Sequence, residues 1–195
     1  MWYADDLIPL NLDDVAAAAK EIEYCNNIFL HWTADRYDRC YEHYHLNITD
    51  DGSLYCCGDL DFNEKRSHTW KRNSGSIGIT MCCAYGAIAN NGYDAEFPNG
   101  YEPTQEQINA MSLCVATILK NAPVSIPISS VLTHKEIACR DGYGVPYGAV
   151  VDGVLQDDSD LRWDLWYLPD DAYGGEMRSG GDVIRGKAIW YQNYI

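Results

Sequence analysis

The chain has 195 residues, of which 47% are hydrophobic and 22% are charged. This length and composition fit one folded domain with its own core, and they exclude a disordered or fibrous chain. Fourteen Lys and Arg against 29 Asp and Glu give a formal net charge of −15. General nucleic-acid binding is excluded on this ground, because proteins that bind duplexes need Lys and Arg to displace phosphate counterions.

The sequence also bears on the compartment in which the protein is made. No apolar stretch approaches the ~20 residues of a membrane span, so we expect no membrane insertion. The N-terminus, Met1–Asp6, lacks the basic flank and the apolar stretch of a signal peptide, so we expect synthesis in the cytoplasm. Eight cysteines are present, and without an export signal we expect reduced core residues and no disulfide framework.

The first elements predicted are a helix, a strand and a second short helix. Acidic residues at the start and alanines in the middle predict a helix over Asp13–Ile22. Ile28–Leu30 is typical of a buried strand, and it would place His31 and Trp32 at its end. A short helix is expected over Ala34–Glu42.

The next segments predict a hairpin and a central strand. The strand-like runs Tyr44–Thr49 and Ser53–Cys57 flank an Asp-Gly pair, Asp51-Gly52, which is a strong turn signal. The run Ser76–Tyr85 is rich in β-formers and almost continuously apolar, as expected of a strand that is covered on both faces.

A capping box predicts the start of the longest helix. Thr104 stands at the N-cap and Gln107 at the reciprocal position, and Pro123 ends the helix. The apolar residues within it are spaced to form one helical face: Ile108, Met111, Val115 and Ile118.

The last third of the chain is harder to interpret. Val131–Thr133 is typical of a short strand that leads into His134, whereas Gly142–Asp160 is expected to be a long loop. Apolar order resumes over Trp163–Leu168, and the tail to Ile195 contains two glycine pairs that we expect to act as hinges. Together the elements predict one mixed α/β domain.

His31 and His134 are the first candidates for chemistry, because both stand at the ends of predicted strands. The chain has no HExxH and no CxxC motif to support a metal site. Since a lone histidine beside a strand is more often a packed or exposed residue, both interpretations stay open for these two residues at this stage.

Six segments in a fixed order resolve this choice, over about residues 28 to 169. They are IFLHWTA, HYHLNITDDGSLY, SHTWKRNSGSIGITMCCAYG, PTQEQINAMSLCVATIL, VLTHKEIACRDGYG and RWDLWYLPD. In this order the chain resembles the zinc-dependent N-acetylmuramoyl-L-alanine amidases of type 2, which include phage lysozymes of the amidase type and peptidoglycan recognition proteins. It looks most like a phage endolysin.

The resemblance implies an α/β fold with a central mixed β-sheet flanked by helices. It also implies a single amidase domain over residues 1–195, with a core at about 25–169 and an extension over 170–195.

The resemblance further implies that one zinc ion (Zn²⁺) is bound by His31, His134 and Asp164. Two imidazoles and one carboxylate, with a fourth position left for water, form a known hydrolytic zinc site. The third ligand of many relatives follows the second histidine much more closely than Asp164 does. The alternatives are therefore Cys139, Asp141 and Asp160, of which Cys139 is the strongest because a thiolate binds zinc well.

Two catalytic residues are implied by position, Tyr44 and Arg162. Tyr44 matches a tyrosine that many relatives place near the zinc water, although an aromatic strand residue can equally serve only to pack the core. Arg162 stands where relatives often carry a lysine that stabilises the oxyanion. Arginine keeps the positive charge but cannot donate a proton, because its pKa stays above ~12.

The segment from Lys65 to Arg72 packs four cations into an otherwise acidic protein. Such a patch suits the carboxylates of a peptidoglycan stem peptide, and a solvated basic loop is the alternative. We expect His43 to be structural. The expected substrate-binding residues are His68, Trp70, Trp32, Lys71 and Arg72.

The function expected from the resemblance is bacteriolytic hydrolysis of the amide bond between N-acetylmuramic acid and L-alanine in peptidoglycan. The enzyme would be a monomer that is made in the host cytoplasm and acts on the cell wall after release. Two alternatives remain, a cytosolic amidase that recycles soluble muropeptides and a non-catalytic module that binds peptidoglycan.

Overall fold

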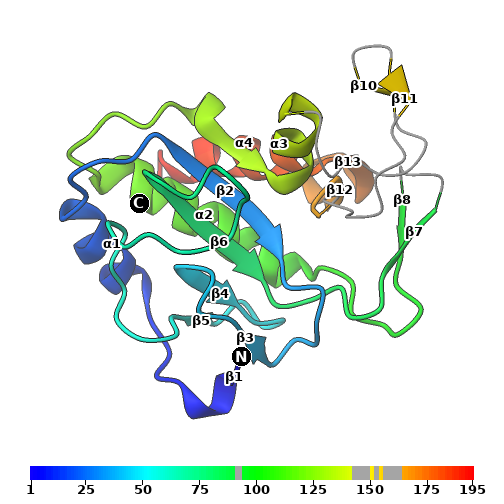
Figure 1. Cartoon of the computed structure of the whole chain (residues 1–195), viewed down its shortest axis with the longest axis horizontal. Helices are drawn as coiled ribbons and strands as arrows, with labels where there is room; N and C mark the ends of the chain where they lie inside the picture. Colours follow the sequence, from blue (N-terminus) through cyan, green and yellow to red (C-terminus); the bar gives the residue numbers. More distant parts are fainter. Residues whose placement is uncertain (91–93, 142–149, 152–153, 156–163) are drawn as a thin grey trace.

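A five-stranded sheet lies at the centre of the computed structural model, which describes residues 1–90, 94–141, 150–151, 154–155 and 164–195 (Figure 1). The strand order is β5-β4-β6-β2-β9. The strands β4, β6, β2 and β9 run parallel to one another, whereas β5 pairs antiparallel with β4. The expected mixed sheet is therefore confirmed. The strands are β2 (Asn27–Trp32), β4 (Leu46–Ile48), β5 (Leu54–Tyr55), β6 (Ser76–Met81) and β9 (Val131–Thr133).

The predicted hairpin and central strand occur where the sequence placed them. β4 and β5 form the hairpin around the Asp-Gly turn, where Gly52 has a positive φ of 83°. β6 pairs with β4 on one side and β2 on the other, which explains its nearly continuous apolar sequence.

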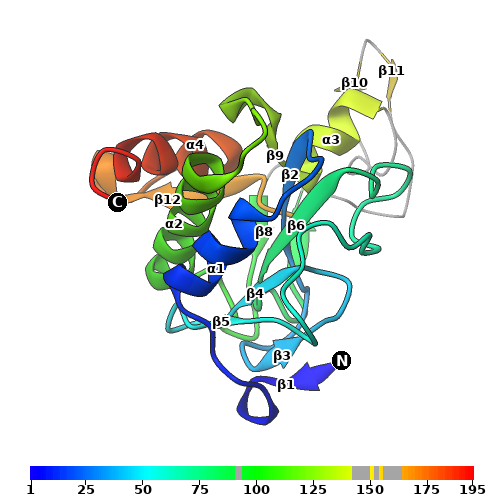
Figure 2. The same ribbon diagram turned by 90° about the vertical axis from the view of Figure 1, so that its left-hand side faces the viewer.

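Helices cover one face of the sheet. α1 (Leu12–Lys20), α2 (Gln105–Asn121) and α4 (Gly180–Tyr191) all lie on the same side of it (Figure 2). α2 begins with the capping box predicted from Thr104 and Gln107. Its predicted apolar residues are fully buried, and they contribute to the main core together with β2 and β6.

The other face of β2 and β6 is covered by the loop between β5 and β6. Because side chains alternate along a strand, Ile28 and Leu30 of β2 pack in the main core with α2, while Phe29 and His31 point to the opposite side. There the ring centroid of Phe29 lies 6.0 Å from that of His68, a residue of this loop.

The helix expected over Ala34–Glu42 is wrong. That segment forms turns and the short strand β3 (Arg39–Cys40), which pairs antiparallel with β1 (Trp2–Tyr3) at the N-terminus. Ala34 has a positive φ of 55°, which is incompatible with a continuous right-handed helix. Pairing with a segment distant in sequence outweighs the local helix propensity here.

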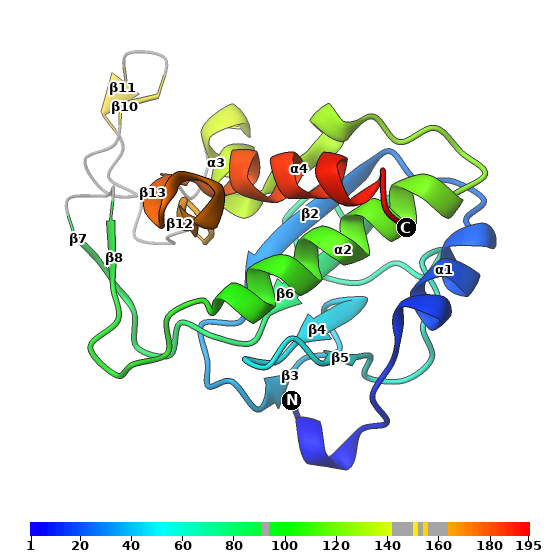
Figure 3. The same ribbon diagram turned by 180° about the vertical axis from the view of Figure 1, so that it is seen from behind.

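The tail also differs from the expectation, because it forms ordered structure that packs on the domain. β12 (Tyr167–Asp170) and β13 (Glu176–Ser179) form an antiparallel hairpin, and α4 then packs along α2 (Figure 3). The second glycine pair starts α4 and is not a hinge. A Cβ on Gly180 would lie 2.1 Å from the carbonyl oxygen of Leu165, so this close approach requires glycine.

The remaining elements are short. None of the described helices is long and apolar enough to cross a membrane. All eight cysteines lie in the described residues, none is in a disulfide, and only Cys139 is more than slightly exposed.

The predicted loop Gly142–Asp160 lies outside the described residues except for β10 and β11. The other elements are η1 (Ala4–Asp6), β7 (Ile88–Asn90), β8 (Asp94–Glu96), η2 (Ile128–Ser130), α3 (His134–Asp141), β10 (Val150–Val151), β11 (Val154–Leu155) and η3 (Asp171–Tyr173).

Candidate metal centre

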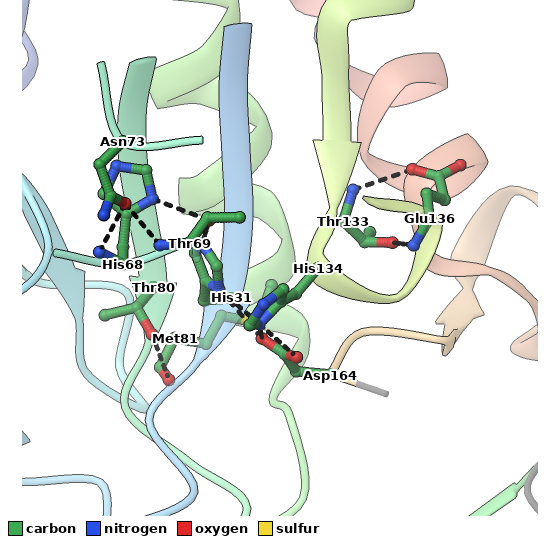
Figure 4. Close-up of polar contacts among 10 residues, drawn as sticks. All are labelled: His31, His68, Thr69, Asn73, Thr80, Met81, Thr133, His134, Glu136 and Asp164. Atoms are coloured by element: carbon green, nitrogen blue, oxygen red, sulfur yellow. Dashed lines mark hydrogen bonds and ion pairs between the residues drawn. The ribbon is translucent and has the colours of Figure 1, made fainter. Parts of the chain in front are cut away.

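Three side chains from distant parts of the chain converge at one end of the sheet (Figure 4). The Nδ1 atoms of His31 and His134 lie 3.2 Å apart. Asp164 contacts both rings, at 3.1 Å from Nδ1 of His31 and 3.0 Å from Nδ1 of His134. His31 and Asp164 are buried, and the His134 side chain is 15% exposed.

The spacing of these three atoms fits a tetrahedral metal ion. Four ligands at about 2.1 Å from zinc lie roughly 3.4 Å from one another, and with Oδ2 of Asp164 the observed separations are 3.1 to 3.3 Å. Among the described residues, His31, His134 and Asp164 form the group of potential metal ligands whose atoms all lie within 4.8 Å of one another. The donor set can therefore hold one ion and leave a fourth position for another ligand.

The fold explains how the two histidines meet. His31 lies near the end of β2, and His134 directly follows β9, the parallel neighbour of β2. Parallel strands that end at one edge of a sheet bring the residues after them together. Asp164 then reaches the same edge just before β12.

The start of α3 holds His134 in place. The Thr133 hydroxyl accepts from the Glu136 backbone N–H, and the Glu136 carboxylate accepts from the Thr133 backbone N–H at 2.8 Å. Arg185 of α4 donates to both carboxylate oxygens of Glu136, at 2.9 and 2.8 Å. The T-x-x-E spacing of Thr133 and Glu136 is a capping-box signal, and it would have predicted the helix α3 that the sequence analysis missed.

The electrostatics favour a neutral His31 ring beside a charged Asp164 carboxylate. Burial lowers the pKa of His31 to about 4, although the hydrogen bond with Asp164 acts in the opposite direction. Burial raises the pKa of Asp164, but His134 and His31 outweigh it and hold that pKa well below its usual range. At neutral pH the His31 ring thus offers a nitrogen lone pair and Asp164 offers a carboxylate, and both are ligands that zinc prefers.

Tyr44 lies beside this group. Its ring centroid is 5.2 Å from that of His31. Burial raises the pKa of the Tyr44 phenol above its usual range, and the charge of Asp164 raises it further. The phenol therefore keeps its proton at neutral pH and can donate a hydrogen bond.

A cavity of about 370 Å³ opens next to His134. Trp70, Lys71 and Arg72, three of the predicted substrate-binding residues, line it. Trp70 is 59% exposed, and the Lys71 ammonium lies 5.9 Å from its ring centroid. The full lining is Thr69, Trp70, Lys71, Arg72, His134, Ile137, Ala138 and Asp141.

Two cations of the predicted basic patch are already paired within the protein. Arg72 binds both carboxylate oxygens of Asp141 at 2.9 and 2.6 Å. Arg66 is buried, donating to the carbonyl of Tyr44 and to Glu64. Since these guanidinium groups fix the loop to α3 and to the segment just before β4, the exposed Lys65 and Lys71 remain to present charge to a ligand.

Three other residues from the sequence analysis, Trp32, His68 and His43, lie outside the cavity lining. Trp32 packs in the main core, with its ring edge-on to Phe97. His68 is 7% exposed, and its ring centroid lies 5.5 Å from that of His31. It does not line the cavity. His43 is exposed, and its ring stacks on Tyr41 with centroids 6.4 Å apart.

The alternative third ligands can be compared in part. Cys139 packs against Ala138 and does not belong to the group of three. Asp141 is engaged by Arg72. Asp160 lies outside the described residues, as does the predicted catalytic residue Arg162.

Comparisons with known proteins address the family. No curated protein matches the chain. Among solved structures, the chain is similar to the Ph2119 endolysin from Thermus scotoductus MAT2119 bacteriophage Ph2119, with 16% sequence identity and a TM-score of 0.41. That similarity covers 70% of this chain and 82% of the other.

The sequence profile of the N-acetylmuramoyl-L-alanine amidases matches residues 20–144. This range spans more than half of the 195 residues and includes both His31 and His134. With an α/β fold that brings these two histidines together, the chain belongs to the N-acetylmuramoyl-L-alanine amidase family.

Proposed function

We propose that this protein is a zinc-dependent N-acetylmuramoyl-L-alanine amidase, and that it cleaves the bond between the lactyl group of N-acetylmuramic acid and L-alanine. The convergence of His31, His134 and Asp164 carries the proposal. Family membership supports the bond that is cleaved, and the ligand types and spacing support zinc. The endolysin role, proposed from the sequence, makes the intact cell wall the natural substrate.

The residues divide the work of hydrolysis. His31, His134 and Asp164 would hold the ion, which when bound supplies Lewis acidity towards water and the scissile carbonyl. The Tyr44 phenol donates a hydrogen bond to the oxygen on which negative charge develops.

The cavity beside His134 is the proposed place of the substrate. Trp70 offers an exposed aromatic wall, and Lys71 adds a positive charge for a stem-peptide carboxylate. Arg72 contributes chiefly by tying this wall to α3 through Asp141. Arg162, proposed from the sequence to stabilise the oxyanion, completes the set.

Product analysis tests the bond. Purified peptidoglycan is digested with the zinc-loaded protein, and new amino groups and new reducing sugar ends are both counted. The proposal predicts new L-alanine amino termini, no new reducing ends and loss of turbidity of isolated walls. New reducing ends without new amines would show glycan cleavage instead, a reaction that normally needs paired carboxylates.

The same assay separates the two alternatives. A recycling amidase would release amines from soluble muropeptides but leave intact walls turbid. A binding module would sediment with the walls and release nothing. The buried Asp164 with its lowered pKa favours an enzyme, since a module that only binds sugar and peptide has no need of a buried charge.

A further inference from the structure

A buried network continues from the ring nitrogen of His31 that points away from the candidate metal centre. Thr69 Oγ1 lies 3.2 Å from Nε2 of His31 and 3.0 Å from Nδ1 of His68. Thr69 is 2% and His68 is 7% exposed, so bulk water does not compete for these groups. Figure 4 shows Thr69 between the two rings.

The network ends on a backbone carbonyl. Nε2 of His68 lies 3.4 Å from Ser76 Oγ, and the Ser76 hydroxyl donates to the carbonyl oxygen of Arg72 at 2.8 Å. A carbonyl can only accept a hydrogen bond, and a serine hydroxyl has one proton to give. The direction of the network is therefore fixed at this end.

The remaining protons follow in turn from that end. With its own proton committed, Ser76 Oγ accepts from Nε2–H of His68. A neutral imidazole that is protonated on Nε2 accepts on Nδ1, so the Thr69 hydroxyl donates to His68. Thr69 Oγ1 in turn accepts from Nε2–H of His31, which leaves a lone pair on the Nδ1 atom that faces the metal centre.

The contact between the two candidate ligands requires such an arrangement. At 3.2 Å, Nδ1 of His31 and Nδ1 of His134 have room for at most one proton between them. At least one of the rings must therefore present a lone pair there. The network identifies His31 as that ring, and His134 is free to donate to Asp164 at 3.0 Å.

The fold makes room for the network. A Cβ on Gly78 of β6 would lie 2.5 Å from Cγ of His68, so the ring occupies the space that a side chain would fill. The Asn73 side chain accepts from the backbone N–H groups of both His68 and Thr69, at 3.1 and 2.7 Å. The backbone of His68 and Thr69 and the ring of His68 are thus both fixed in position.

We propose that Thr69, His68 and Ser76 are positioning residues that hold His31 in its Nε2–H tautomer and so present Nδ1 to the metal. Partners of this kind commonly change metal affinity by about 10- to 100-fold when they are removed. The inference rests on the proposed zinc function for its consequence, but the tautomer itself can be measured without metal.

The first test is ¹⁵N NMR of the histidine rings in metal-free protein. We expect His31 to carry its proton on Nε2 in the wild type and in Thr69→Ser, which keeps the hydroxyl. In Thr69→Val the acceptor is lost, and we expect the proton to move towards Nδ1. Thr117→Val, an equally buried change in α2, is the control and should leave the His31 signals unchanged.

The second test is zinc affinity, measured by competition with a chelator. Thr69→Val should weaken binding by about 10- to 100-fold, Ser76→Ala should weaken it by a smaller factor, and Thr69→Ser should restore it. Ser112→Ala is the matched control, because Ser112 is also buried and donates to a carbonyl, that of Ile108.

The outcomes separate this inference from the proposed function. Wild-type His31 protonated on Nδ1, or equal zinc affinity in Thr69→Val and the wild type, would overturn the network. A wild-type protein that binds no zinc would overturn the proposed function, and the ring spectra would still decide the tautomer.

Discussion

Tyr44 is the residue whose role the structure sharpens most. Its ring lies beside His31, and its phenol stays protonated because of burial and the charge of Asp164. If this hydroxyl stabilises the oxyanion, Tyr44→Phe should lower turnover of a muropeptide by about 10²-fold or more and leave zinc content unchanged. Tyr41→Phe removes a phenol that instead binds Asp35 and should retain activity. Near-normal turnover in Tyr44→Phe would assign this ring to packing.

Arg162 carries a second prediction at the scale of single residues. If it stabilises the oxyanion, Arg162→Ala should lower turnover by about 10²-fold or more, with folding and zinc content intact. Arg162→Lys keeps the positive charge and should recover much of the rate. Equal rates in Arg162→Ala and the wild type, measured on the same muropeptide, would remove Arg162 from the mechanism.

At the residue scale, the sequence predicted which candidate ligands converge better than it predicted their surroundings. His31 and His134 could be proposed because each stands at a strand end within a family pattern. Thr69 and Ser76 could not, since a hydroxyl beside a histidine is visible only when β6 and its preceding loop are brought together. Trp32 was expected to bind substrate, but alternation along β2 directs it into the core.

Among the elements, the loop that covers β6 depends on His45. The His45 ring accepts from the Gly78 backbone N–H on Nδ1 and donates to the Glu64 carbonyl from Nε2, both at 2.9 Å. Burial lowers the pKa of His45 to about 4, from an ordinary value of 6.5. Between these values the unfolded chain binds a proton that the folded protein does not, so stability falls as the pH falls through this window.

The expected loss is ~3 kcal/mol of unfolding free energy between pH 6.5 and 4 from His45. Urea unfolding of metal-free protein across this range measures it. His45→Gln can keep both hydrogen bonds but cannot be protonated, so its stability should fall less over the same range. Equal losses in the variant and the wild type would show that His45 does not contribute to acid sensitivity.

The helix α4 offers a second test at this scale, because two of its three glycines lie in different surroundings. A Cβ on Gly180 would meet the Leu165 carbonyl at 2.1 Å, whereas a Cβ on Gly186 would meet nothing within 4 Å. Gly180→Ala should therefore cost about 1–3 kcal/mol of stability, and Gly186→Ala should add about 0.5–1 kcal/mol through helix propensity.

Gly180→Ala should also weaken zinc binding, because Leu165 directly follows Asp164. Thermal unfolding and zinc affinity of the two variants are measured side by side. Equal stability in both would show that α4 is not held against the candidate metal centre by this contact.

The elements that could be predicted are those with local signals. The capping box of α2 and the Asp-Gly hairpin depend on neighbouring residues, and both were confirmed. The helix predicted over Ala34–Glu42 was wrong because β3, within this segment, pairs with the N-terminal strand β1, which is distant in sequence. The glycine pairs of the tail predicted hinges, because the sequence does not distinguish a glycine required by close packing from one required for flexibility.

At the scale of the whole molecule, the family pattern predicted the mixed sheet and its flanking helices. The proposed centre draws on three separate parts of the sequence, and Asp164 lies beyond the residues that match the family profile. Spacing alone left Asp164 and Cys139 as rivals. Only the folded chain places Asp164 beside both histidines and packs Cys139 against Ala138.

Zinc stoichiometry tests the central claim most directly. Protein stripped with a chelator is titrated with zinc, and bound metal is counted for the wild type, Asp164→Ala and Cys139→Ala. We expect about one zinc ion per chain in the wild type and in Cys139→Ala, and greatly weakened binding in Asp164→Ala. A wild type without zinc, or zinc that is retained in Asp164→Ala and lost in Cys139→Ala, would contradict the proposed centre.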